Sequence, residues 1–182
     1  MTRLFVGIEL PDPVKDTLLR IESGIPGAHW QTAEQLHLTL RFIGEVDGPG
    51  ATDIANALDL VEASGFDLEV KGVGIFGAPK RAHALWAGIT DNPALNHLQA
   101  KIESALVRSG ITPETRNFHP HITLARLRNP DRVRLLDFLQ IHDGLILPPF
   151  EVDRFTLFSS FVTHKGSIYT AEETYALGPT TA

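Results

Sequence analysis

The sequence predicts a mixed fold of strands and helices, with two similar lobes in a single domain that spans residues 1–182. Segments with the period of a strand alternate along the chain with amphipathic helical segments. A tetrad of histidine, apolar, threonine and apolar residues occurs twice, at 37–40 and at 121–124. Each half of the chain offers one tetrad strand, further strands and about two helices. Because no linker of disordered composition separates the halves, we expect one continuous sheet or two sheets packed edge to edge.

In the first half, apolar runs indicate strands, and Pro and Gly indicate where helices begin and end. The segment 3–10 is typical of a buried strand, and the Pro-containing segment 11–13 begins a helix that ends by 24–27. Trp30 leads through a polar loop to the first tetrad strand, which we expect to end at Gly44. The other elements expected here are a helix from Gly48, a strand over 66–70 and its hairpin partner over 84–89.

In the second half, Asn92-Pro93 is a typical helix start and Gly110 a typical helix end, so we expect the longest helix between them. The second tetrad strand follows this helix. A short helix is expected around 133–139. The segments 150–161 and 167–177 are expected to form a closing hairpin.

Composition restricts the classes of protein to which the chain can belong. A hydrophobic content of 43% and a charged content of 21% are typical of a globular domain, and the absence of cysteine excludes disulfides and thiolate metal sites. The N-terminus becomes acidic at Glu9, before a signal-peptide core could form, and no apolar run approaches the roughly 18 residues of a membrane helix. We therefore expect a cytoplasmic monomer without membrane contact. The net charge of −6 argues against an extended, non-specific nucleic-acid surface, but one locally held phosphate remains compatible with it.

The two tetrads carry the candidate chemistry. Side chains alternate between the faces of a strand, so the histidine and the threonine of each tetrad share one face. Two facing imidazoles can act as general acid and general base near neutral pH, which makes His37 and His121 the candidate catalytic residues. Thr39 and Thr123 offer hydroxyl groups to the oxygens of a phosphate held between the histidines. This set suits hydrolysis of a 2′,3′-cyclic phosphate with neither metal nor cofactor.

Two arginines and a third histidine lie close to the tetrads in sequence. Arg41 follows the first tetrad threonine by two residues and stays on its face, so alternation alone favours Arg41 as a phosphate ligand. Arg126 follows the second tetrad threonine by three residues and turns to the opposite face unless the strand twists or ends first. His119 shares a face with His121 by parity, and its role as an assisting, metal-binding or structural residue is open.

Motifs beyond the tetrads extend over nearly the whole chain. They comprise the segments 3–11, 36–45, 72–77, 85–88 and 118–126, together with Trp30, Ser160, Gly166 and Tyr169. Through these residues the chain resembles the two-histidine (2H) phosphoesterase superfamily. The resemblance is closest to its bacterial and archaeal branch of RNA 2′,3′-cyclic phosphodiesterases, historically called 2′-5′ RNA ligases.

The resemblance implies a bilobal α+β fold with a central active-site cleft lined by the tetrads. Each of two lobes, related by a pseudo-twofold axis, would have an antiparallel sheet with outer helices. The implied substrate is RNA with a 2′,3′-cyclic phosphate end, or a small cyclic nucleotide, and the implied product is a 2′-phosphomonoester. Members of this branch also show a weak, ATP-independent reverse joining of RNA ends.

The resemblance also assigns roles to individual residues. His37 resembles the general acid, which donates a proton to the 3′ oxygen, and His121 resembles the general base that activates water. Thr39 and Thr123 resemble the donors to the phosphate oxygens. Arg126, at the end of the second motif, resembles the residue that contacts the phosphate, which overrides the preference for the other arginine.

Other interpretations remain open at the level of sequence. Metal-dependent hydrolysis could use His119 and His121 with carboxylates, although a ligand string such as H-E-x-x-H is missing. A non-catalytic module that holds a nucleotide or an RNA end is a third class. Trp30, Phe42 and Trp86 could stack on a nucleobase, but strand aromatics more often belong to the core, and parity places Phe42 on the apolar face.

Overall fold

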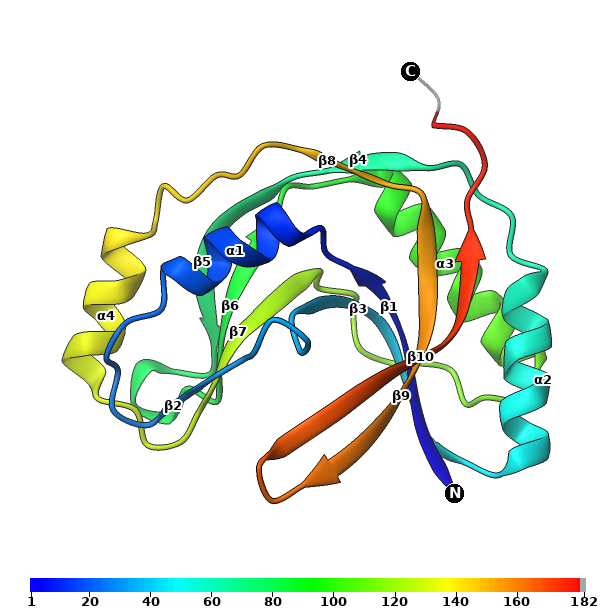
Figure 1. The fold of residues 1–182 in the computed structure, drawn as a ribbon, viewed down its shortest axis with the longest axis horizontal. Helices are drawn as coiled ribbons and strands as arrows, with labels where there is room; N and C mark the ends of the chain where they lie inside the picture. The colour runs from blue at the N-terminus through cyan, green and yellow to red at the C-terminus, as the bar shows by residue number, and fades with distance from the viewer. Residues whose placement is uncertain (181–182) are drawn as a thin grey trace.

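The computed structural model describes residues 1–180 and shows the α+β fold that the sequence led us to expect (Figure 1). Within these residues, an eight-stranded sheet has the strand order β10-β9-β1-β3-β7-β6-β5, with β2 paired to β7, and a second sheet consists of β4 and β8. The pairs between these strands are antiparallel. The strands are β1 (Thr2–Glu9), β2 (Ala28–Trp30), β3 (His37–Val46), β4 (Phe66–Leu68), β5 (Val70–Phe76), β6 (Ala84–Ile89), β7 (His121–Leu127), β8 (Phe150–Val152), β9 (Arg154–Thr163) and β10 (Gly166–Ala176). The helices are α1 (Asp12–Arg20), α2 (Gly48–Asp59), the 3-10 helix η1 (Pro79–Arg81), α3 (Pro93–Arg108) and α4 (Arg132–Ile141).

Helix starts follow the capping signals of the sequence. The Asn92 side chain accepts a hydrogen bond from the backbone N–H of Leu95, as the predicted N-cap of α3. Asp47 caps α2 in the same way, and Asp131 caps α4. Gly110 follows α3 with a φ of +100°, a left-handed conformation that favours glycine, which confirms the predicted end of that helix.

The continuous sheet divides into two lobes of the same construction. The strands β9, β1 and β3 form one lobe, and β5, β6 and β7 form the other in the mirrored order along the sheet. One residue pair, Leu38 with Ile122, joins β3 to β7 at the centre, and both residues are fully buried. The pseudo-twofold axis therefore passes through the middle of the two tetrads.

The lobes do not coincide with the halves of the sequence, contrary to our expectation. The first lobe combines the N-terminal strands with the C-terminal β9 and β10, whereas the second consists of strands from the middle of the chain. Helices α2 and α3 pack on the first lobe, and α1 and α4 lie on the side of β5, β6 and β7 (Figure 1). Each lobe is therefore completed by segments that are far apart in sequence.

Several predicted strands have different bounds in the structure. The strand expected over 66–70 is two strands, because β4 leaves the main sheet to pair with β8. The segment 150–161 divides for the same reason into β8 and β9. The first tetrad strand continues to Val46 past Gly44, which adopts a φ of +97°. Trp30, expected before a polar loop, ends the short strand β2.

Candidate active site

The two tetrads meet at the centre of the sheet, with their histidines and threonines on one face. Since Leu38 pairs with Ile122 in antiparallel register, His37 lies level with Thr123, and Thr39 lies level with His121. These four side chains are half-buried, while the apolar residues of both tetrads are buried in the core. The strand parity that we predicted for the tetrads is thus confirmed.

Both histidines are oriented by the same backbone contact. Nδ1 of His37 donates to the carbonyl oxygen of Gln35 at 2.7 Å, and Nδ1 of His121 donates to that of His119 at 2.6 Å. A carbonyl oxygen can only accept, so each Nδ1 carries a hydrogen and each Nε2 is the nitrogen available for proton exchange. Nε2 of His37 lies 2.7 Å from Oγ1 of Thr39.

Burial makes both histidines weaker bases than a free imidazole. The pKa of His37 is lowered to about 4, first by burial and then by the positive charges of His121, Arg126 and Lys15. The pKa of His121 is also lowered, first by burial and then by the charge of His119. Both imidazoles are therefore neutral at pH 7 in the unliganded protein.

A β-bulge after each tetrad decides which arginine faces the site. The pairing of β3 with β1 shifts register at Leu40, and the pairing of β7 with β6 shifts register at Leu124. One extra residue in a strand reverses the parity of every residue after it. Arg126 is therefore exposed on the face of the histidines, as the resemblance implied, and Phe42 occupies the equivalent position after the first tetrad.

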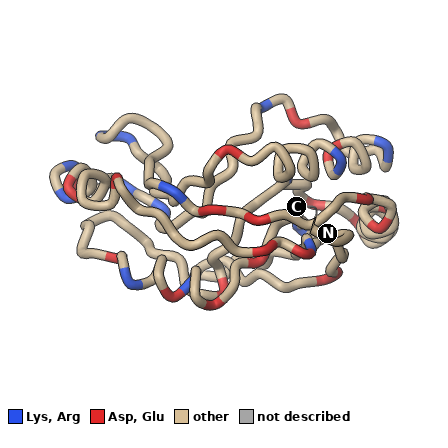
Figure 2. Tube along the Cα trace, turned by 90° about the horizontal axis from the view of Figure 1, so that it is seen from above, with Lys and Arg blue, Asp and Glu red and all other residues tan. Residues whose placement is uncertain are grey.

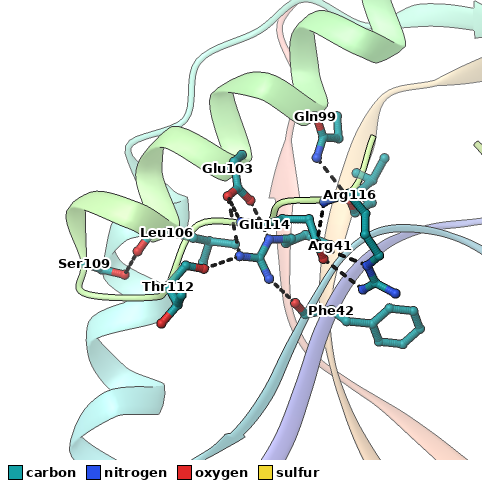
Figure 3. A network of polar contacts seen from close by, with 10 residues as sticks. Arg41, Phe42, Gln99, Glu103, Leu106, Ser109, Thr112, Glu114 and Arg116 are labelled. Carbon is teal, nitrogen blue, oxygen red and sulfur yellow. Dashed lines mark hydrogen bonds and ion pairs between the residues drawn. The ribbon is translucent and has the colours of Figure 1, made fainter. Parts of the chain in front are cut away.

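The same bulge turns Arg41 away from the face of the tetrads, so simple alternation predicted the wrong side of the strand for this residue. Arg41 is 7% exposed, and its Nε donates to Oε2 of Glu103 at 2.5 Å (Figure 3). Its guanidinium also donates to the carbonyl oxygens of Phe42 and Thr112, the latter at 2.6 Å. Burial raises the pKa of Glu103, but the hydrogen bonds from Arg41 and from the backbone N–H of Glu114, together with the charge of Arg41, leave this pKa below its ordinary value.

The network around Arg41 fixes the loop that leads to the second tetrad. Oε1 of Glu103 accepts from the backbone N–H of Glu114 at 2.8 Å. The Glu114 carboxylate in turn accepts from the backbone N–H, Nε and Nη2 of Arg116 (Figure 3). This loop leads directly into β7. The Arg41 guanidinium, on the core side of β3, therefore helps to position the strand that bears His121.

Aromatic residues surround each histidine, and they differ between the lobes. The ring of His37 lies 4.9 Å from Phe5 and 5.2 Å from Tyr169, between ring centroids. The ring of His121 lies 4.8 Å from Phe76 and 6.4 Å from Trp86. We had not singled out these partners of the histidines from the sequence, although the motif segments contain them, because pairing between distant strands creates the contacts.

Three aromatics that we weighed as base-stacking residues have different surroundings. Phe42 is 57% exposed, so its predicted place on the apolar face is wrong. Trp30 packs against Phe138 of α4, which agrees with a core role. The ring of Trp86 covers Gly74, where an added Cβ would come within 2.3 Å of it.

A cavity of about 530 Å³ opens beside His121. Phe42 and Phe76 contribute apolar walls, and Arg116 and His119 contribute polar ones. A larger cavity of about 830 Å³ lies between α2, α3 and the C-terminal segment, far from the tetrads in the fold, and contains none of their residues. We therefore associate the chemistry with the cavity beside His121.

The position of His119 bears on the metal hypothesis. Its ring lies 5.9 Å from that of His121 and 5.1 Å from that of Trp86, so it belongs to the wall of the site. Among residues 1–180, no three His, Asp or Glu side chains gather as metal ligands would.

A helix that spans a membrane must be both long and apolar. None of the helices within residues 1–180 is long and apolar enough to cross a membrane.

Two strand-borne histidines, two threonines and an arginine around the axis of a bilobal antiparallel sheet define the class of two-histidine phosphoesterases. Comparison with known proteins identifies the family within this class. The chain belongs to the family described as LigT like Phosphoesterase, whose model matches residues 8–86 and 88–169. Each matched range contains one tetrad.

Individual relatives agree with this family. An RNA 2′,3′-cyclic phosphodiesterase of Aeropyrum pernix is 34% identical over 138 residues, which cover 75% of this chain and 78% of the relative. A protein of the same name from Aquifex aeolicus is 28% identical and covers 98% of both chains. The crystal structure of E. coli LigT complexed with 3′-AMP has a TM-score of 0.76 at 27% identity, covering 97% of this chain and 98% of that chain.

Proposed function

We propose that the protein is an RNA 2′,3′-cyclic phosphodiesterase that hydrolyses cyclic phosphate ends to 2′-phosphomonoesters by acid–base catalysis. The observation that carries this proposal is the pairing of Leu38 with Ile122, which puts two histidines and two threonines on one face around a single axis. The names of the relatives in Aeropyrum and Aquifex support the same activity. The ligand named for the E. coli structure, 3′-AMP, supports a nucleotide in the site.

In the proposed reaction, Nε2 of His121 takes a proton from a water molecule as the water oxygen attacks phosphorus. The bond between phosphorus and the 3′ oxygen breaks, and Nε2 of His37 gives that oxygen a proton. The products are a 2′-phosphomonoester and a free 3′ hydroxyl group. Thr39 and Thr123 donate hydrogen bonds to the non-bridging oxygens, and Arg126 neutralises the charge that develops there.

Because the pKa of His37 is lowered, substrate binding must favour protonation of this residue. Neutral His121 is ready to act as a base at pH 7, but His37 must bind a proton before it can act as an acid. A phosphate anion beside Arg126 offsets the positive charge that disfavours the imidazolium of His37. Substrate binding therefore raises the pKa of His37, and the imidazole takes up a proton from solvent before it donates one to the 3′ oxygen.

The exposed aromatic at the site is the proposed platform for the nucleobase. Phe42 stands where the second lobe has Arg126, so one lobe would hold the phosphate and the other the base. Base stacking on an aromatic ring tolerates every base, which fits an enzyme that acts on RNA ends of varied sequence. We further propose that the protein acts as a monomer in the cytoplasm and that the same groups catalyse weak reverse joining to a 2′-5′ linkage.

Turnover of defined substrates tests this proposal. Wild type, H37A and H121A are incubated with 2′,3′-cyclic AMP and with RNA that ends in a cyclic phosphate, in the presence of a chelator. We expect a 2′-phosphate product, a bell-shaped pH profile and a loss of at least about 10² in kcat for each variant. The control is H97A, whose histidine lies on α3 in the cavity remote from the tetrads.

Each contrary outcome rejects a specific part of the proposal. A 3′-phosphate product would contradict the assignment of His37 to the 3′ oxygen. Loss of activity in the presence of chelator would favour metal-dependent hydrolysis. Activity of H121A equal to that of wild type would contradict the role of His121 as the base. Binding of the nucleotide by wild type without any hydrolysis would mean that the protein is a binding module.

A further inference from the structure

One end of the molecule is basic although the chain as a whole is acidic. We define the basic end as the exposed side chains of Lys80, Arg81, Arg126, Arg128, Arg132 and Arg134. With Asp131, the segments 80–81 and 126–134 carry a charge of +5, while the remainder of the chain carries −11. Figure 2 shows Lys and Arg at the end of the molecule that holds α4. The net charge of the sequence therefore conceals a local positive surface.

Tertiary pairing brings the two segments of the basic end together. Arg126 of β7 pairs with Ala84 at the start of β6, which is separated by two residues from η1 and its cations Lys80 and Arg81. The backbone N–H of Leu127 donates to the carbonyl oxygen of His83. Helix α4, which begins at Arg132, packs against η1.

Within residues 1–180, no ion pair involves the side chains of the basic end, since all four ion pairs use other cations. Asp131 uses its carboxylate to cap α4 by accepting from the backbone N–H of Arg134 at 3.0 Å. Arg132 and Arg134 lie in the first turn of α4, which contains no acidic residue, and positive charge is unfavourable at a helix N-terminus. Their position costs helix stability, so it is better explained by an anionic partner.

The basic end is continuous with the site. Arg126 belongs to both, because the bulge in β7 turns it to the face of His121 while its position near the end of the strand puts it beside η1. Arg126 lies five residue steps along the strand from His121, a backbone span of about 16 Å. A chain with repeated negative charges could thus run from the histidines along β7 and onto η1 and the start of α4.

We propose that the basic end binds the phosphates of the single-stranded RNA whose cyclic phosphate end occupies the site. This inference rests on the proposed function, since it takes the RNA end to lie between the tetrads. A cyclic mononucleotide has no further phosphate and cannot use this surface. The basic end thus distinguishes RNA ends from small cyclic nucleotides by affinity, without reading sequence.

Charge reversal at the basic end tests the inference. The variants K80E/R81E and R132E/R134E leave the tetrads and Arg126 intact, and K71E/R108E is a control with the same change in net charge. Lys71 and Arg108 are exposed, at the opposite end of β5 from η1 and at the end of α3 respectively. The affinity for a fluorescent single-stranded RNA with a 2′-phosphate end is measured by anisotropy over a range of salt concentrations. Kinetics are measured with cyclic-phosphate-ended RNA and with 2′,3′-cyclic AMP.

We expect each variant of the basic end to weaken RNA binding at least about tenfold and to reduce the salt slope by about 1.4, the value for two lost phosphate contacts on a single strand. Hydrolysis of 2′,3′-cyclic AMP should stay within about twofold of wild type, and the charge-conserving K80R/R81K should bind RNA normally. Unchanged RNA affinity in the variants, or equal weakening in the control, would overturn the inference. If wild type hydrolyses neither substrate but the variants still lose RNA affinity, the proposed reaction fails and the binding surface stands.

Discussion

His37 and His121 show how neighbouring residues can give two identical motifs different properties. Both rings use Nδ1 for a carbonyl oxygen two residues earlier. Gly7 leaves room beside His37, where an added Cβ would lie 3.6 Å from Cδ2 of the ring, while Trp86 holds the equivalent place next to His121. The deeper burial of His37 explains its lower pKa. The tetrads alone predicted an acid–base pair, but the difference between its members depends on residues from other strands.

A nuclear magnetic resonance titration of the histidine rings tests the role of the substrate phosphate. We expect His37 in the free protein to titrate near pH 4 and to shift upward when 2′-AMP binds, because the phosphate offsets the charge of Arg126. In R126M the free protein should already titrate higher. A His37 pKa that stays fixed on ligand binding would contradict the proposed route by which this residue gains its proton.

The two arginines next to the tetrads give a second test at the level of residues. R126M should keep the stability of wild type, because Arg126 is exposed, but should lose about 10² in kcat/KM for 2′,3′-cyclic AMP through its lost contact to the phosphate. Steady-state kinetics and urea denaturation of the same preparation separate the two effects. Unchanged kinetics would remove Arg126 from the site.

At the level of elements, the β-bulges explain why strand alternation predicted the faces of some side chains correctly and of others wrongly. The alternation of each tetrad predicted its faces correctly, since the bulge begins only at the fourth residue, Leu40 or Leu124. Beyond the bulge the same rule misplaced Arg41 and Phe42, because one inserted residue reverses parity. A bulge forms through pairing with a partner strand, so a local pattern does not reveal it. The resemblance implied a role for Arg126 at the site, and the bulge turns this residue to the face of the histidines.

Substitution of Arg41 tests whether this residue, which the bulge turns toward the core, stabilises the fold and does not take part in catalysis. R41M removes the charged partner of Glu103 and the anchor of Thr112, and should cost about 2–4 kcal/mol of unfolding free energy. In conditions where R41M is fully folded, its kcat/KM should fall by less than tenfold, unlike that of R126M. Urea denaturation with kinetics on the folded protein is the measurement, and R108M is the control. A loss of activity equal to that of R126M would return Arg41 to the site.

For the whole molecule, composition predicted the class of protein well and its surface poorly. The length and the hydrophobic content predicted one globular domain, and among residues 1–180 eight strands from both lobes share the main sheet. The net charge of −6 argued against an extended nucleic-acid surface, but an average over the chain cannot show that η1 and α4 bring cations together. The division into lobes was also not predictable, because β1 pairs with β9 rather than with a strand of its own half.

The stability of the whole molecule should depend on pH through His37. Its pKa is about 4 in the folded protein and about 6.5 when unfolded, so the unfolded state binds more protons between these values. The stabilisation is complete above about pH 6.5 and declines by about 3 kcal/mol as the pH falls to about 4, with His121 adding in the same direction. Urea denaturation at several pH values should show this decline in wild type and H97Q and a smaller one in H37Q. Equal slopes in the three proteins would mean that His37 is not buried as described.

The pairing of β1 with β9 also has a consequence for the order in which the protein folds. Arg3 meets Ser160, so the first strand made on the ribosome lacks one neighbour until most of the chain has been synthesised. The middle strands β5, β6 and β7 have no such wait, because their partners lie within the central part of the chain. Contacts of long sequence separation slow folding. During synthesis, the lobe that carries His121 can therefore form before the lobe that carries His37, which must remain incomplete until the C-terminal hairpin emerges.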